Sequence, residues 1–280
     1  MEKIKNEYES KINEYCELTN TLPDKIFKDP KQEFRYFCYR HIDLITKKKI
    51  TDLKTSLDNE VVLIEFRILP HLEFLLLNTI LKLGNTWSYT IVCGIDNYEF
   101  MNLLASKISS NIKIIKLEYN NININKYNEI LTSAVFWNLF IGSKILIWQE
   151  DSCIFQSNIN EFINWDYIGA AWPRNDNSYG VGNGGLSLRT KSMMIDIINK
   201  EKPEDTQTYY NYEYNIIPED VYFTTNMIKH KIGKLAIKNE AIKFSDEQFQ
   251  YSNSFGGHNF FTHNKNWKEL MYSRVISNYL

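Results

Sequence analysis

Acidic side chains follow an apolar run near the middle of the sequence, a pattern that suits binding of a phosphorylated ligand. Residues 144–148 read KILIW, and Gln149, Glu150 and Asp151 come directly after them. A short apolar run of this kind is typical of a buried strand. The acidic pair at its end is either part of a solvated loop or part of a site for a metal ion and a phosphate group. The choice depends on where this strand ends in the fold.

A second acidic pair stands at the start of a predicted helix, in the segment PEDVYF at 218–223. The helix dipole favours carboxylates such as Glu219 and Asp220 at this position, so capping explains them without any chemistry. A general base that takes a proton from a hydroxyl group is also a carboxylate directed into a cleft. The residue types alone leave both interpretations open.

Two further segments supply a glycine pair and a histidine. VGNGGLSLR contains Gly184 and Gly185, where the backbone can approach a ligand closely, although a structural turn explains the glycines equally well. His258 lies in GGHNFF, and a single histidine is more often neither ligand nor catalyst. Asp151 and His258 could nevertheless bind a hard divalent cation together with two phosphate oxygens.

Another predicted strand, VVLIEFR at 61–67, ends in Glu65 and Arg67. A guanidinium group binds phosphate through two parallel hydrogen bonds, which makes Arg67 a candidate for a phosphate contact. An ion pair between Arg67 and a neighbouring carboxylate is the alternative.

Strand patterns alternate with helical patterns between residues 61 and 149. The predicted strands are 61–67, 87–94, 111–119 and 144–149, and the predicted helices between them are 70–83, 97–108 and 125–140. This order predicts an α/β fold with a mainly parallel sheet, in which ligands bind beyond the carboxyl ends of the strands. Arg67 and the acidic pair then lie at that edge, which favours a functional site.

The chain outside this region divides into an extension and a continuation of the main domain. We expect further helices at 190–200 and from residue 217, and short strands and loops in the tail. Residues 1–56 are predicted to be an N-terminal helical extension of a domain at 57–280. The first 20 residues carry an apolar helical face that packs on the main domain or on a second copy, which would give a homodimer; its residues are Ile4, Tyr8, Ile12, Tyr15 and Leu18.

Composition excludes several classes of protein. The net charge of −2 and the pI near 6.2 provide no basic surface for nucleic acid. The four cysteines lie far apart with no C-x-x-C pair, which predicts free thiols in a reducing compartment. The N-terminus is charged throughout, unlike a signal peptide, and no apolar run is long enough to span a membrane. These features predict a soluble, cytoplasmic protein.

The order of the segments resembles a known group of proteins. IWQEDSCIF, DYIGAAWP, GNGGLSLR, PEDVYF and a late FS-x-E/GGH segment follow one another over about residues 60–262. This order is similar to that of uncharacterised glycosyltransferase-like proteins of microbes and large DNA viruses. If the protein is viral, the resemblance implies that it acts in the host cytoplasm or in a viral factory. It also resembles inverting GT-A enzymes of the β1,3-galactosyltransferase and fringe type.

The resemblance implies a GT-A-type fold and an enzyme that transfers a sugar from a nucleoside diphosphate, most often UDP, to a glycan or glycoconjugate hydroxyl group with inversion. Asp151 and His258 would bind Mn²⁺ or Mg²⁺. Asp220, or Glu219 in its place, would be the general base. The donor site would further include Glu65, Arg67, Gln149, Glu150, Trp172 as an aromatic wall, and Gly184 and Gly185 as the floor.

One residue departs from the pattern of the resembling enzymes. The first position of their D-x-D motif is Gln149 here, so only the last acid, Asp151, is retained. The metal could therefore be bound largely through the diphosphate. Two alternative functions stay open from the residues: a non-catalytic sugar- or nucleotide-binding protein on the same fold, and a sugar-phosphate nucleotidyltransferase.

Overall fold

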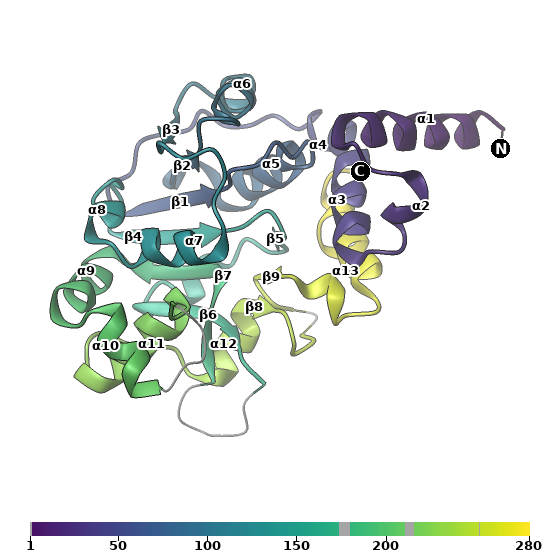
Figure 1. Ribbon diagram of the computed structural model, residues 1–280. Helices are drawn as coiled ribbons and strands as arrows, with labels where there is room; N and C mark the ends of the chain where they lie inside the picture. Colours follow the sequence, from purple (N-terminus) through teal and green to yellow (C-terminus); the bar gives the residue numbers. More distant parts are fainter. Residues whose placement is uncertain (1, 174–179, 211–215, 252) are drawn as a thin grey trace.

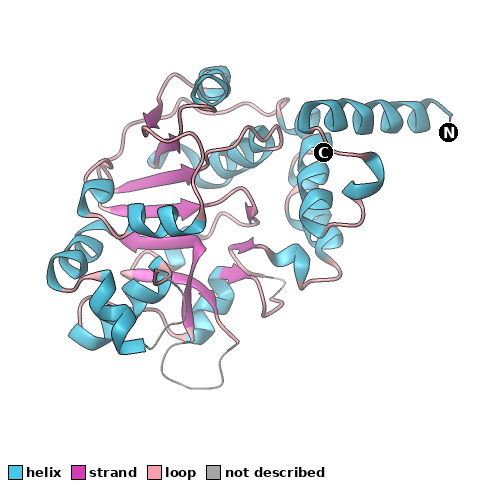
Figure 2. Ribbon diagram, in the orientation of Figure 1, coloured by secondary structure: helices cyan, strands magenta, loops and turns pink. Residues whose placement is uncertain are grey.

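A six-stranded sheet forms the centre of the computed structural model, which describes residues 2–173, 180–210, 216–251 and 253–280 (Figures 1 and 2). The first four strands in sheet order are parallel to one another, and the last two are antiparallel to their neighbours. In sheet order the strands are β3 (Ile112–Lys116), β2 (Ser88–Cys93), β1 (Asn59–Ile64), β4 (Lys144–Trp148), β7 (Val181–Thr190) and β6 (Tyr167–Ala171). The predicted α/β class with a mainly parallel sheet is confirmed.

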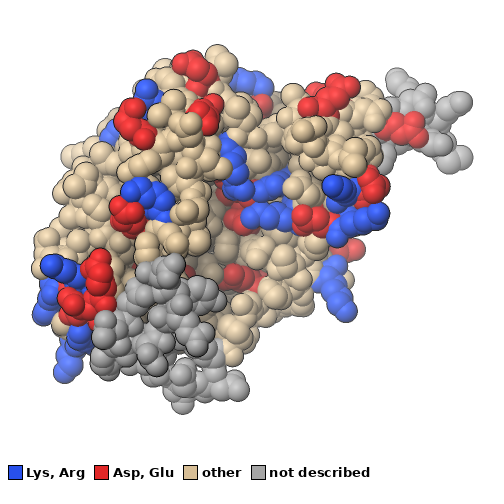
Figure 3. Space-filling view, viewed as in Figure 1, with Lys and Arg blue, Asp and Glu red and all other residues tan. Residues whose placement is uncertain are grey.

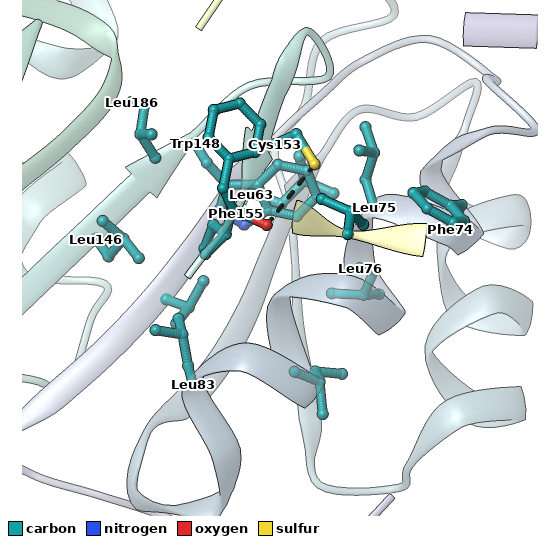
Figure 4. Packing of buried hydrophobic residues seen from close by; sticks show 14 of the residues in the cluster. Leu63, Phe74, Leu75, Leu76, Leu83, Leu146, Trp148, Cys153, Phe155 and Leu186 are labelled. Atoms are coloured by element: carbon teal, nitrogen blue, oxygen red, sulfur yellow. Dashed lines mark hydrogen bonds between the residues drawn. The ribbon is translucent and has the colours of Figure 1, made fainter. Parts of the chain in front are cut away.

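The central strands are apolar throughout because helices cover both faces of the sheet. Successive residues of β1 alternate between two cores: Val61 and Leu63 belong to one, and Val62 and Ile64 to the other. The first core contains α5 (Leu72–Leu83) and α6 (Tyr98–Ile108), and Figure 4 shows Leu63 and Trp148 packed among the leucines of α5. The second contains α7 (Ile124–Leu131), α8 (Ala134–Trp137), α9 (Lys191–Lys200) and α11 (Glu219–His230).

Two segments differ from the sequence-based expectation. The single helix predicted at 125–140 is two helices, α7 and α8, because Ser133 has an extended backbone and Thr132 turns its hydroxyl back to the carbonyl of Asn128. The glycines of VGNGGLSLR lie inside strand β7, although glycine weakens strands in general. The strand persists there because β6 pairs with it at Asn183 and Val181, and its pairing with β4 begins directly after the glycines, at Leu186.

The tail also contains more regular structure than predicted. A small second sheet has the order β5 (Ser152–Ile154), β9 (Gly256–His258) and β8 (Ser245–Asp246). The helix α12 (Lys238–Phe244) lies in the segment at 237–261 expected to hold only strands and loops, and α13 (Trp267–Arg274) follows that segment. After β1, the described residues also include α10 (Pro203–Tyr210) and the 3₁₀ turns η1 (Gly84–Thr86), η2 (Ile159–Glu161), η3 (Phe260–Thr262) and η4 (Ile276–Asn278).

The N-terminal residues form α1 (Glu2–Thr19), α2 (Pro23–Ile26), α3 (Pro30–Arg40) and α4 (Ile42–Ile45), which lie beyond the ends of β1 and β4, with α3 beside α13 (Figure 1). Phe34 of α3 stacks on Phe261 with ring centres 4.6 Å apart, so this helix is part of the first core. Tyr15 of α1 packs on two tyrosines of α3, whereas Leu18 is exposed. The side chains of Ile4 and Tyr8 lie outside the described residues.

Two further observations concern expectations drawn from composition. All four cysteines are free thiols. In the described ranges, none of the helices combines the length and the apolar character that a membrane span requires.

Candidate functional site

A cavity of about 370 Å³ opens at the carboxyl ends of β1 and β4. Glu65 and Arg67 follow β1, and Gln149, Glu150 and Asp151 follow β4, so the sheet brings these two predicted segments together. Tyr127 of α7 and Lys31 of α3 line the same cavity. Figure 3 shows basic and acidic side chains gathered in the hollow between α7 and the N-terminal helices.

Glu150 is the buried centre of a charged network. Arg35 of α3 donates two hydrogen bonds to its carboxylate, at 2.5 and 3.0 Å. Lys31, Arg67 and His71 also lie within 3.3 Å of its oxygens. Although burial alone would raise it, the pKa of Glu150 lies below its usual range because His71 and Arg35 stabilise the ionised form. Glu150 therefore holds α3 against the end of β4.

Asp151 lies between a lysine and a histidine. Its Oδ2 accepts a hydrogen bond from Nζ of Lys31 at 2.6 Å, and its Oδ1 is 3.4 Å from Nε2 of His258. The other ring nitrogen of His258 is 3.3 Å from Oε1 of Glu247. Burial disfavours the charged imidazole, but the carboxylates of Asp151 and Glu247 outweigh it and raise the pKa of His258 to about 10. The side chains of Asp151, His258 and Glu247 thus form a row of alternating charge.

A divalent cation fits between Asp151 and His258 if it displaces the proton from His258 and if other ligands complete its coordination. Among the described residues, no three His, Cys, Asp or Glu side chains are grouped to hold a metal ion by themselves. The Oδ1 of Asp151 is buried without a hydrogen-bond partner, and the ligands of an octahedral cation lie about 3 Å apart, close to its distance from His258. Glu247 stands where a carboxylate commonly orients a metal-binding histidine. The missing ligands could come from a diphosphate.

The glycine pair of β7 lies between this row and the start of α11. A Cβ atom on Gly185 would overlap the ring of His258, and one on Gly184 would overlap the carboxylate of Glu219. The backbone N–H of Gly184 donates to Oδ2 of Asp220 at 3.3 Å, and the carbonyl of Gly185 accepts from the N–H of Gln149 at 3.0 Å. Both positions therefore require glycine, because side chains from opposite directions meet the strand there.

The two carboxylates at the start of α11 have different surroundings. Glu219 is buried and paired through both oxygens with the buried guanidinium of Arg189, which also lies 4.6 Å from the ring centre of Tyr167. Among the described residues, no cation forms such a pair with Asp220, which accepts hydrogen bonds from the backbone N–H groups of Gly184 and Val221. Burial, and then the negative charge of Glu219, raises the pKa of Asp220 from its usual value of 3.8 to about 7. Asp220 can therefore gain and lose a proton near neutral pH, whereas Glu219 is committed to an ion pair.

Two other predicted residues have mainly structural contacts. Arg67 forms a two-fold hydrogen bond with Glu65, at 2.7 Å for each pair of atoms, which is the ion pair that the sequence left as an alternative. Its side chain is 44% exposed and still reaches the cavity. Trp172 is partly buried against the second core and does not line the cavity beside Gln149. It follows β6 directly and borders residues that the structure does not describe.

Three residues of the site, Lys31 and Arg35 of α3 and Glu247 after β8, were not predicted from the sequence. Lys31 and Arg35 are four residues apart and so share one face of a helix, but nothing in the sequence indicates that this face meets the acidic pair. Glu247 follows β8, and its position beside His258 depends on the pairing of β8 with β9. The only signal in the sequence was the acidic character of the FS-x-E segment.

The family match lies across most of this site. A family described as "Protein of unknown function (DUF5672)" matches residues 111–258, more than half of the chain. The chain belongs to this family. The matched DUF5672 region includes the acidic pair after β4, the glycine pair, Asp220 and His258, and it excludes α3 and the end of β1. No curated protein matches the sequence.

Three solved structures resemble this DUF5672 protein in outline. The inositol-1-phosphate CTP transferase from T. maritima has a TM-score of 0.45 at 9% identity and covers 77% of this chain and 96% of its own. The apo form of mouse xyloside xylosyltransferase 1 has a TM-score of 0.49 at 10% sequence identity, and the match covers 74% of this chain and 99% of the xylosyltransferase chain. The 4-diphosphocytidyl-2C-methyl-D-erythritol synthase from Anaerococcus prevotii has a TM-score of 0.40 at 10% sequence identity, and the match covers 66% of this chain and 94% of the synthase chain. All three TM-scores are below 0.5, and no activity of this chain follows from matches at that level.

Proposed function

We propose that this protein is a nucleotide-sugar-dependent glycosyltransferase of the GT-A type that transfers its sugar with inversion. The observation that carries the proposal is the placement of two unlike carboxylate sites on either side of Gly184 and Gly185. Asp151 with His258 lies on one side and suits a cation bound to a diphosphate. Asp220 lies on the other side, with a pKa of about 7. The proposed donor is a UDP-sugar, and the proposed acceptor is a hydroxyl group of a glycan or glycoconjugate.

The reaction needs one base and one means of stabilising the leaving group. Asp220 takes the proton of the acceptor hydroxyl group as the acceptor oxygen bonds to the anomeric carbon. The bond between that carbon and the phosphate oxygen breaks, and the electron pair leaves with the nucleoside diphosphate. A divalent cation held by Asp151 and His258, when bound, would neutralise charge on the departing diphosphate. Gly184 and Gly185 let the side chains of Glu219 and His258 lie directly against the strand that separates the two groups.

The test combines a ligand screen with a matched pair of variants. Thermal unfolding of the wild-type protein is measured with nucleotides and nucleotide sugars, each with Mn²⁺ and with EDTA, because a ligand that binds the folded state raises the unfolding temperature. Donor hydrolysis and transfer are then measured for the donor that binds. Asp220→Asn should lower transfer by about 10²–10⁴-fold, the contribution typical of a general base. Asp205→Asn, an exposed position on α10, is the control and should leave transfer unchanged.

The pH dependence gives a second measurement. Asp220 acts as a base only when ionised, so transfer by the wild-type protein should rise with pH through about pH 7. The proposal fails if no nucleotide sugar binds or reacts. It also fails if Asp220→Asn transfers sugar at the wild-type rate. Release of pyrophosphate from a nucleoside triphosphate and a sugar phosphate would instead identify a nucleotidyltransferase.

A further inference from the structure

Helix α3 presents Lys31 to the cavity from a fixed position. Asp29 caps the helix by accepting a hydrogen bond from the backbone N–H of Lys31 at 2.9 Å, and Pro30 stands at the first helical position. One turn further on, the buried ring of Phe34 stacks on Phe261, and Arg35 is bound to Glu150. The backbone of Lys31 is therefore held by contacts on both sides, and only its side chain is free to change position.

The cations of the cavity differ in how firmly they are held. The side chain of Arg35 is only 10% exposed, and its guanidinium group donates two hydrogen bonds to Glu150. The guanidinium group of Arg67 donates two hydrogen bonds to Glu65. Lys31 is 35% exposed and lines the cavity, and its ammonium group is a compact charge on a flexible stem that can turn without breaking a planar, two-fold bond. Lys31 is the cation of the three that can exchange its partner.

The charged side chains in the cavity wall and directly behind it balance one another. Lys31 and Arg67 line the cavity together with the carboxylates of Glu65, Glu150 and Asp151, and the buried Arg35 lies behind Glu150, to which it is hydrogen-bonded. A diphosphate would bring at least two further negative charges next to these carboxylates. A cation on Asp151 would at the same time repel the ammonium group that now bonds to its Oδ2. Both effects would move the ammonium group of Lys31 from the carboxylates toward the phosphate oxygens.

We propose that Lys31 is a phosphate-binding residue. Its ammonium group binds Asp151 and Glu150 until a diphosphate-containing ligand enters the cavity, and then binds the phosphate oxygens. The N-terminal extension is then part of the donor site. This inference rests on the proposed function for the identity of the ligand as a nucleoside diphosphate. It deepens that function by assigning a direct contact with the leaving group to a residue outside the region that matches the family.

The experiment measures binding by calorimetry, so it does not depend on turnover. The probes are UDP, uridine and inorganic pyrophosphate, each with EDTA and with Mn²⁺. Lys31→Met should weaken binding of UDP and of pyrophosphate by about ten- to a hundredfold, the range expected for loss of a charge-assisted hydrogen bond, in EDTA as well as in Mn²⁺. Uridine, which has no phosphate, should bind Lys31→Met and the wild-type protein equally.

Two companion variants separate phosphate binding from a purely structural effect. Lys31→Arg retains the charge and should recover most of the affinity lost in Lys31→Met. Lys28→Met removes an exposed lysine of the same extension, one that pairs with Asp24 outside the cavity, and should change no affinity. Thermal unfolding of each variant without ligand shows whether the fold is retained.

Equal affinity of Lys31→Met and the wild-type protein for UDP and pyrophosphate would overturn the inference. So would an equal loss of affinity for uridine, because that would indicate a distorted site. The proposed function fails separately: if the wild-type protein binds pyrophosphate in a Lys31-dependent way but binds no nucleotide or nucleotide sugar, the phosphate contact stands and the donor assignment does not. If the wild-type protein binds neither UDP nor pyrophosphate, the inference is wrong.

Discussion

Asp220 should make the protein less stable as pH rises, and Asp220→Asn should remove that dependence. The pKa of Asp220 is about 7 in the folded protein, above its usual value of 3.8. The folded state therefore keeps a proton that the unfolded chain has already released, and its stability falls as pH rises from about 4 to about 7. Below pH 4 both states hold the proton, and the group contributes no pH dependence.

The size of the effect follows from the same two values. A rise in pKa from 3.8 to about 7 corresponds to an upper limit of about 4 kcal/mol, at about 1.4 kcal/mol for each pH unit. Asp220 is only partly buried, which reduces the cost of ionising it, so we expect about 2 kcal/mol. The free energy of unfolding of Asp220→Asn, relative to the wild-type protein, should therefore increase by about 2 kcal/mol between pH 4 and pH 8.

Urea unfolding of both proteins at pH 4, 5, 6, 7 and 8 measures this difference. The hydrogen bonds that the carboxylate accepts from the N–H groups of Gly184 and Val221 favour its ionised form, and the pKa of about 7 already includes their effect. Asp58→Asn, at an exposed position, is the control for removal of a carboxylate. A difference between Asp220→Asn and the wild-type protein that stays constant with pH, or that falls as pH rises, would refute the reasoning.

Three other substitutions have expected outcomes. Glu219→Gln leaves a buried guanidinium without its anionic partner and should lower the free energy of unfolding by about 3 kcal/mol, measured in urea at pH 7. Gly185→Ala should displace the ring of His258 and abolish the rise in unfolding temperature that Mn²⁺ and UDP together produce, whereas Gly180→Ala, where a Cβ meets only ordinary contacts, should retain it. Phe34→Ala should lower the free energy of unfolding by about 3–5 kcal/mol and weaken binding of pyrophosphate, measured by calorimetry, because it loosens α3.

The sequence was sufficient where one local pattern decides the structure. The four parallel strands and two of the helices between them follow from apolar periodicity and from stop signals such as Gly84, whose φ of 74° only glycine adopts readily. The glycine-rich start of strand β7 could not be predicted because its glycines are tolerated only through pairing with β6. That pairing is set by the whole sheet, which no local window of sequence contains.

The candidate site divides in the same way. Positions after strands β1 and β4 could be placed at one edge from the order of elements alone, and the structure puts Arg67 and Asp151 beside one cavity. The contacts of Lys31 depend on how an entire helical extension docks, and those of Glu247 on a two-residue strand. Neither contact leaves a trace in residue spacing, because the partners are far apart in the chain.

The docking of α3 has a consequence for synthesis of the chain. Glu33 of this helix pairs with Lys268 of α13, 235 residues later, and the aromatic partners of Phe34 lie in the same late segment. At about 5–20 residues per second, the ribosome needs about 10–50 s to make those partners after α3 has emerged. During this interval the apolar face of α3 lacks the aromatic side chains that later cover it. We therefore expect nascent chains that stop before residue 260 to bind chaperones through α3, and the cavity to form only after α13 has been made.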